Sequence, residues 1–252
     1  MKKIIATTLL LATTLINANT NIFKKLNLQC DQIINKEKIN MQICYSYKYK
    51  GPLAVIYKLN GNLVNKTNIK KRPRFYAEKA IPKAYRVKPG DYTYATSSLN
   101  YNIKFDRGHL APDADFDYNY KALLKVYTMA NIVPQEKYLN EKTWIKAEKY
   151  ERLMATKLHN ILVINLVKYN NINNILVKQP LSVAMGNKNW SLNKIRKYKK
   201  QAEKLKEKHI VIPSSFVKII INKDFKKCLE YKNIQTNWKE DKLKNHLINC
   251  EF

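Results

Sequence analysis

The stretch that decides the fold runs from residue 106 to residue 148 and carries three short motifs. They read DRGHLAP at 106–112, TMANIVPQ at 128–135 and LNEKTWIKAE at 139–148. The first motif places a histidine, His109, two residues after an arginine, Arg107. An imidazole can take up a proton near neutral pH, and the guanidinium fork of an arginine matches the oxygens of a phosphate. A DRGH tetrapeptide alone is a weak pattern, because an isolated histidine is more often structural than catalytic, so its meaning depends on the motifs that follow.

The order and spacing of the motifs are more specific than any one of them. An Asn-x-x-Pro-Gln turn starts at Asn131, and an Asn-x3-Trp-x3-Glu pattern runs from Asn140 to Glu148. With these motifs the chain resembles the non-specific DNA/RNA endonuclease family of the ββα-metal (His-Me finger) superfamily. The resemblance covers roughly residues 72–168 and resumes at 212–216. It implies a single α+β domain with a central antiparallel sheet flanked by helices.

The same resemblance gives three residues a role at the reacting centre. His109 would be the general base, Asn140 the single protein ligand of a Mg²⁺ ion, and Glu148 the carboxylate beside the water shell of that ion. A hard cation keeps several of its waters, so one neutral amide oxygen is sufficient when a phosphate supplies another ligand. Mn²⁺ or another divalent ion is the alternative cofactor.

The remaining site residues have supporting roles. The resemblance implies that Arg107 and one upstream arginine, either Arg72 or Arg74, contact phosphate. Asn131 is grouped with these substrate-binding residues and is expected to support the finger geometry. Asp106 is placed second, as a residue that holds the finger or supports a water on the metal.

Helix geometry alone does not decide which glutamate serves the site. Asn140 and Glu148 are separated by about 80° on a helical wheel, so both can face one side, but Glu151 lies closer still to the direction of Asn140. The family pattern selects Glu148. A further acidic run, DADFD at 113–117, has metal-like alternation but lacks the glycine and distal glutamate of a calcium loop. We expect it to form a solvated acidic turn.

The charge balance points to a polyanionic partner. The 252 residues include 47 Lys+Arg and 19 Asp+Glu, a formal net charge of +28. Such an excess of like charge opposes folding and is typical of proteins that bind nucleic acid. The densest basic runs are 70–74 and 194–208. Contacts of this kind to the phosphate backbone carry no sequence preference, so DNA and RNA are both expected as partners. Four aromatic residues near these charges are candidates for stacking on exposed bases: Tyr76, Tyr85, Trp190 and Tyr198.

Residues 1–18 are predicted to be a secretory signal peptide. Lys2 and Lys3 precede an apolar run at 4–16, and Ala18 supplies the small residue before a cut. The run is too short for a membrane-spanning helix. We therefore expect residues 19–252 to form a secreted or periplasmic domain with no membrane association after cleavage, as a monomer or a homodimer.

The four cysteines fit an exported protein. An even number of cysteines in such a chain indicates two disulfides, and four cysteines allow three pairings. The spacing favours Cys30–Cys44 and Cys228–Cys250, because each pair closes a short local loop.

Several elements are expected around the motifs. A hairpin is predicted over 53–63 with its turn at Asn60-Gly61, and a surface loop over 70–91. Helices are predicted over 140–159 and 192–209, and buried strands over 160–168 and 210–221. Residues 121–130 fit either a short helix or a strand. The irregular interleaving of strands and helices agrees with an α+β fold.

Three functions are compatible with these features. The leading one is a secreted, metal-dependent endonuclease without sequence specificity. The second is a catalytically weak or inert basic protein that binds nucleic acid on the same scaffold. The third, a cationic membrane-active protein, is poorly supported by the distribution of core-like strands. The set of His109, Asn140 and Glu148 favours the first, since a binder has no need of all three.

Overall fold

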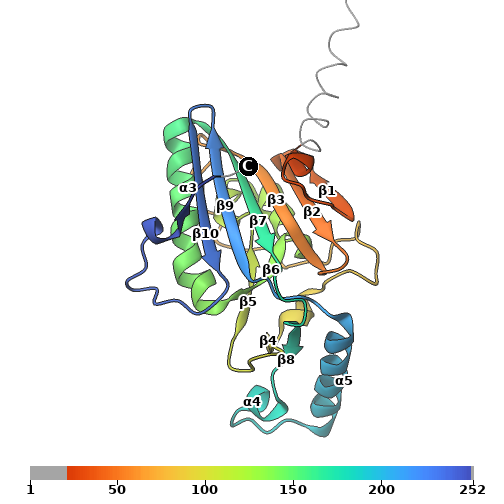
Figure 1. Ribbon diagram of the computed structural model, residues 1–252. Helices are drawn as coiled ribbons and strands as arrows, with labels where there is room; N and C mark the ends of the chain where they lie inside the picture. Colours follow the sequence, from red (N-terminus) through yellow and green to blue (C-terminus); the bar gives the residue numbers. More distant parts are fainter. Residues whose placement is uncertain (1–21, 251–252) are drawn as a thin grey trace, which may run out of the picture.

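A computed structural model describes residues 22–250 of the chain. Its centre is a seven-stranded antiparallel sheet with the order β1-β2-β3-β7-β9-β10-β11 (Figure 1). The strands are β1 (Gln32–Lys36), β2 (Met41–Ser46), β3 (Gly51–Asn60), β7 (Asn160–Lys168), β9 (Ser215–Asn222), β10 (Phe225–Lys232) and β11 (Leu247–Ile248). The signal peptide predicted at 1–18 lies outside the described residues. Within the described range, no helix has both the length and the apolar character needed to cross a bilayer.

The predicted hairpin at 53–63 is wrong. The strand β3 continues without reversal to Asn60, and residues 61–75 then form turns and coil. β3 pairs instead with β2 and with β7, where Tyr57 lies opposite Val163. Gly61 allows the backbone to approach the end of α3 (Ile145–Leu158) closely. A Cβ at Gly61 would lie 2.1 Å from the carbonyl oxygen of Ala155, and the Gly61 amide donates to His159 O at 2.7 Å.

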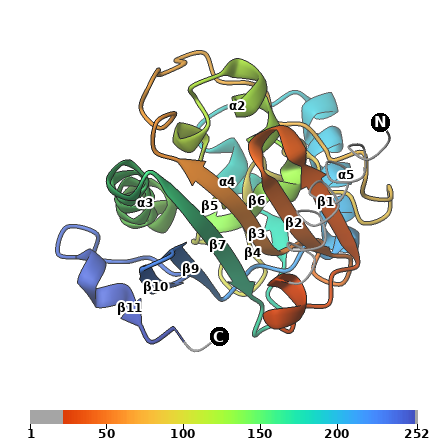
Figure 2. The ribbon, with the colours of Figure 1, turned by 90° about the horizontal axis from the view of Figure 1, so that it is seen from above.

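One face of the sheet is covered by the elements of the motif region. These are the hairpin of β5 (Phe105–His109) and β6 (Ile132–Glu136), the helix α2 (Tyr120–Val126), the π-helical segment η5 (Leu139–Trp144) and the helix α3 (Ile145–Leu158). Figure 2 shows α2 and α3 along this side of the strands. The main core lies between these layers, around the fully buried Trp144 and Tyr57. The helix predicted over 140–159 is confirmed, except that its first turns have the wider π geometry.

A second, smaller cluster of elements lies beyond one end of the sheet (Figure 1). It contains β4 (Ala95–Ser97), β8 (Leu176–Lys178), α4 (Leu181–Met185) and α5 (Leu192–Lys208), and we call it the arm. An apolar cluster that includes Leu176, Leu205 and Ile212 joins the arm to Phe105 of β5 and Ile132 of β6, and we call it the arm core. The strand predicted over 210–221 therefore begins only at Ser215, because residues 210–213 pack into the arm core first.

Five short 3₁₀ turns complete the described chain. They are η1 (Glu37–Ile39), η2 (Pro89–Tyr92), η3 (Asp113–Asp115), η4 (Met129–Asn131) and η6 (Leu243–His246). Both favoured disulfides are present: Cys30–Cys44 ties the N-terminal segment to β2, and Cys228–Cys250 ties the C-terminal segment to β10.

Candidate active site

The site is built on a β-hairpin followed by a helix. β5 and β6 pair antiparallel, with Gly108 opposite Val133 and His109 opposite Ile132, and the chain then enters η5 and α3. The glycine of DRGH is required by packing, since a Cβ at Gly108 would meet the side chain of Gln135 at 2.2 Å. The DRGH motif on β5 and the Asn-x-x-Pro-Gln turn at β6 thus fold into one hairpin that places His109 at the end of β5.

Asn131 holds the loop that follows His109. Its side chain is completely buried; Oδ1 accepts from Ala111 N at 2.9 Å, and Nδ2 donates to Ala111 O at 3.0 Å and to Val126 O at 2.9 Å. The amide has no exposed surface to offer a substrate. Grouping Asn131 with the substrate-binding residues is therefore not supported, whereas its expected role in the finger geometry agrees with these bonds.

His109 lies in a largely apolar setting. Its ring is 5.3 Å from the ring of Phe75 and 5.0 Å from that of Tyr127, measured between centroids. Burial lowers the pKa of His109 from 6.5 to about 4; the charge of Asp113 opposes this shift, and Arg72 adds to it. Nε2 is buried and has no hydrogen-bond partner among the described residues. A neutral imidazole with an unused nitrogen is suited to accept a proton.

Asn140 is oriented by Asp106. Its Nδ2 donates to Asp106 Oδ2 at 3.1 Å, which leaves the amide oxygen as the atom available to a cation. The described residues contain no group of three or more His, Cys, Asp or Glu side chains that could hold a metal. A site with a single Asn ligand does not need such a group, because a hard cation accepts a neutral oxygen and keeps several waters. The side chains present therefore fit the expected Mg²⁺ site.

The structure separates the two candidate glutamates. Glu151 is fully buried, accepts from Tyr57 Oη at 3.0 Å and is ion-paired with Lys218, which is equally buried. These contacts use both of its carboxylate oxygens inside the core. Glu148 lies one turn earlier and is electrostatically coupled to Asp113, as His109 is. Burial raises the pKa of Glu148 to about 8, and Lys218 counteracts this shift. The charge of Asp113 thus acts on both Glu148 and His109.

The acidic run at 113–117 is not a solvated turn. Asp115 is fully buried and paired with Arg152 at 2.9 Å, and Asp117 is 5% exposed and paired with Arg72 at 3.2 Å. Asp113 accepts from Tyr127 Oη at 2.9 Å. The alternation that resembled a metal loop instead directs successive carboxylates toward two arginines, which neutralise them inside the protein.

The three arginines of the site differ in their engagement. Arg72 is paired with Asp113 at 3.3 Å and Asp117 at 3.2 Å, and its buried Nη1 has no partner within residues 22–250. Arg107 is exposed, its guanidinium lies 4.9 Å from the Phe75 ring centre, and Nη1 donates to Pro89 O at 3.5 Å. Arg74 is exposed, and no ion pair of the described residues engages it. The Phe75 ring thus lies close to both Arg107 and His109.

Sequence reasoning missed the groups that surround the catalytic candidates. Phe75, Tyr127 and Asp113 form the setting of His109, yet they come from three separate segments. The sequence did contain a sign of another buried group, Lys218, because this single lysine interrupts the apolar run FVKIII within β9. A charge at such a position needs a buried partner, and Glu151 supplies it.

An antiparallel sheet carrying a histidine hairpin, followed by a helix with an Asn and a Glu, defines the ββα-metal class of nucleases. The chain belongs to the DNA/RNA non-specific endonuclease family, whose family model matches residues 18–251. A solved chain from the EndoG/EndoGI complex has the same fold, with a TM-score of 0.63 at 16% identity, over 88% of this chain and 81% of that one.

Curated relatives match the central part of the chain. Human "Endonuclease G, mitochondrial" is 26% identical over 128 residues, 51% of this chain and 40% of that protein. "Nuclease EXOG, mitochondrial" of Xenopus laevis is 25% identical over 130 residues, 52% of this chain and 34% of that protein. "Mitochondrial nuclease" of Saccharomyces cerevisiae is 24% identical over 123 residues, 48% and 35% of the two. The match spans well under half the length of these relatives.

Proposed function

We propose that the protein is a metal-dependent endonuclease that hydrolyses phosphodiester bonds in DNA and RNA without sequence preference. The observation that carries this proposal is the state of His109. Burial keeps its imidazole neutral, its buried Nε2 has no hydrogen-bond partner among the described residues, and the charges of Arg72 and Arg107 act on the ring. Family membership supports the same activity.

Each side chain has a task in this reaction. His109 takes a proton from the attacking water as the new P–O bond forms, and the bond to the leaving oxygen breaks. Arg107 and an upstream arginine hold the non-bridging phosphate oxygens, where negative charge develops. A divalent ion at the amide oxygen of Asn140 would, when bound, offset that charge and ease departure of the leaving oxygen. Asp106 keeps the Asn140 amide in orientation, and Glu148, whose ionised form a nearby cation would favour, would accept hydrogen bonds from water beside that cation.

We also propose export from the cytoplasm, with residues 1–18 as the signal peptide and 19–252 as the nuclease domain. Two intramolecular disulfides support this, because such bonds persist in oxidising compartments. The matched relatives carry mitochondrial names, so the destination is a property to be measured for this chain. Fractionation of cells that express the full-length chain, followed by N-terminal sequencing, would test both the compartment and the cleavage site.

The activity is tested by digestion of plasmid DNA and of RNA, with Mg²⁺ and with EDTA. We expect the wild type to degrade both substrates only with Mg²⁺, and His109→Ala to lose at least about 100-fold in rate, the usual scale of a general base. A matched control is His159→Asn, an exposed histidine at the end of α3. If the wild type binds nucleic acid but leaves it intact with Mg²⁺, the protein is an inert binder and the proposal is wrong.

A further inference from the structure

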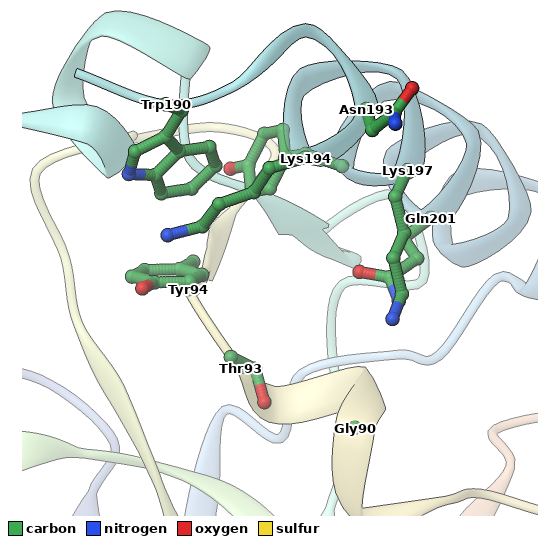
Figure 3. A pocket seen from close by; sticks show the side chains of 9 residues that line it. Gly90, Thr93, Tyr94, Trp190, Asn193, Lys194, Lys197 and Gln201 are labelled. Atoms are coloured by element: carbon green, nitrogen blue, oxygen red, sulfur yellow. The ribbon is translucent and has the colours of Figure 1, made fainter.

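A pocket in the arm gathers three aromatic rings and two lysines. It has a volume of about 550 Å³ and lies between α5 and the turn at η2 (Figure 3). Trp190, Tyr94 and Tyr198 supply the rings, and Lys194 and Lys197 of α5 supply the charges. This volume is within the range of pockets that bind small ligands, about 300–1,000 Å³.

The three rings meet at a tilt or edge to face, and none is stacked in parallel on another. Trp190 and Tyr198 are 5.4 Å apart at 71°, and Tyr94 lies 5.8 Å from Trp190 at 53°. Other aromatic pairs of the chain are closed by parallel stacking, among them Tyr47–Tyr85 at 5°. Of the aromatic candidates for base stacking, Tyr85 therefore already has one face covered by Tyr47, whereas Trp190 has no parallel ring partner among the described residues. A planar ligand can insert next to a ring face only where no other ring already covers it.

The pocket is held in shape by buried polar contacts. Tyr198 Oη donates to Gln179 O at 2.6 Å, and this bond fixes the position of the Tyr198 ring in the pocket lining. Lys178 is 7% exposed, and its ammonium donates to Gly90 O at 2.9 Å, to Asp91 O at 3.1 Å and to Thr93 O. The wall formed by η2 is therefore pinned to β8. A rigid platform loses little conformational entropy when a ligand binds.

The backbone at Tyr94 is strained in a way that presents its ring. Tyr94 has φ of +55°, a left-handed conformation that a bulky residue rarely adopts, and the residue is 45% exposed. The turn places this ring opposite Trp190 rather than in the arm core. Strained positions of this kind cluster at ligand sites, because a gain in function is needed to retain them.

The charge around the pocket selects an anion. The first nine residues of α5, LNKIRKYKK at 192–200, hold five cationic side chains and no acidic one. The N-terminal end of this helix adds the positive end of its dipole. In Figure 3 the Lys194 side chain extends toward Trp190, and its ammonium lies 4.1 Å from the Trp190 ring centre. A base that stacks on Trp190 takes the place of this ammonium, which can then pair with the phosphate of the same nucleotide.

The pocket adjoins the candidate active site through η2. Gly90 of η2 lines the pocket, while its neighbour Pro89 accepts the hydrogen bond from Arg107. A strand whose phosphate lies at Arg107 can therefore continue across η2 to the aromatic rings. Bases of a duplex are paired and stacked within it, so only an unpaired base can offer its faces to this pocket.

We propose that the arm pocket binds an unpaired nucleobase of single-stranded DNA or RNA and so favours single-stranded substrates over duplexes. The idea rests on the proposed function for the statement that the bound strand is a substrate. Binding itself is measured without cleavage, in EDTA and in the His109→Ala background, so it can be judged even if the nuclease assay fails. The probes are labelled DNA and RNA oligonucleotides, each as a single strand and as a duplex of equal length.

Two variants remove a ring each. For Trp190→Ala and for Tyr94→Gly we expect about tenfold or greater loss of affinity for single strands, the scale of one lost base stack, and less than about twofold change for duplexes. Tyr94→Gly also relieves the left-handed backbone, so its melting temperature should not fall far, and a binding loss there cannot be ascribed to unfolding. Tyr120→Ala, an exposed tyrosine of α2, is the matched control.

A substitution that removes one lysine charge tests the proposal independently of the two ring variants. Lys194→Gln should flatten the log–log salt dependence of single-strand binding by about 0.7, whereas Lys223→Gln, at the exposed β9–β10 turn, should not. A loss confined to DNA or to RNA supports the pocket and identifies its ligand. Unchanged single-strand affinity in both ring variants, or an equal loss for duplexes, would overturn the proposal. A wild type that binds in this pattern but does not cleave would refute only the nuclease activity.

Discussion

The amide of Asn140 donates a hydrogen bond to the carboxylate of Asp106, from Nδ2 to Oδ2 at 3.1 Å. The two residues are 34 positions apart, one on β5 and the other in the π-helical segment before α3. Because this bond uses the amide nitrogen of Asn140, the amide oxygen remains to bind a cation. We therefore propose that Asp106 orients Asn140 at the metal site and is not itself a ligand.

Loss of Asp106 should weaken the metal site. We expect Asp106→Ala to raise the Mg²⁺ concentration for half-maximal cleavage by about 10- to 100-fold, the usual effect of removing a group that orients a metal ligand. Activity should recover in part at high Mg²⁺, because Asn140 is still present. The measurement is a Mg²⁺ titration of plasmid cleavage, with Asp224→Ala in the exposed β9–β10 turn as the control. An unchanged titration would show that Asp106 does not orient the ligand.

The two glutamates of α3 should separate activity from stability. Glu148→Gln should lower the cleavage rate by about 100-fold with little change in unfolding, because its carboxylate is proposed to act beside the cation. Glu151→Gln should lower the free energy of unfolding by about 3–5 kcal/mol, because Lys218 would be left buried without its charged partner. Urea denaturation and plasmid cleavage on both variants test this. The reverse pattern would assign the catalytic role to Glu151.

The burial of His109 should appear in the pH dependence of stability. Its pKa is lowered from 6.5 to about 4, so the unfolded chain binds a proton more readily than the folded protein between these values. The contribution of neutral His109 is fully present above 6.5 and is lost as the pH falls toward 4. Wild-type stability should therefore decline relative to His109→Gln across this window, as measured by urea denaturation of the metal-free proteins. A difference that does not vary with pH would contradict the burial of the imidazole.

The two upstream arginines should behave differently. Arg74 is exposed, so Arg74→Gln should leave the stability unchanged and reduce the log–log salt slope of duplex binding by about 0.9, the value of one phosphate contact. Arg72→Gln, in contrast, should lower the stability of the fold, because Asp113 and Asp117 lose their partner. Salt titrations of binding in EDTA, combined with thermal melting, distinguish them. If only Arg72→Gln alters the slope, Arg72 is the phosphate contact.

Each disulfide should stabilise the fold by a similar amount. The bonds close loops of 14 and 22 residues, and the chain-entropy estimate for loops of this size is about 3 kcal/mol each. Replacing Cys228 and Cys250 together by serine should lower the free energy of unfolding by about that amount. The paired change of Cys30 and Cys44 is the matched comparison. Non-reducing mass mapping of the wild type should recover these two links and no others.

The sequence by itself determined the local and the chemical features. The order of DRGH, Asn-x-x-Pro-Gln and Asn-x3-Trp-x3-Glu indicated the family, and the strand at 160–168 and the helix at 192–208 follow from residue patterns that need no distant partner. The disulfide pairs were favoured for the same reason, since loop closure costs less over a short separation. Properties that depend on neighbours in the chain were thus open to prediction.

Only the tertiary structure decided which of several similar side chains are engaged inside the protein. Glu151 is held in the core by Lys218, 67 residues further along the chain, and the buried Asp115 and Asp117 are paired with Arg152 and Arg72. The pairing of β3 with β7, rather than with a hairpin partner, likewise joins segments about 100 residues apart. Burial and ion pairing are set by groups that meet only after the chain has folded, so a local sequence pattern cannot predict these contacts.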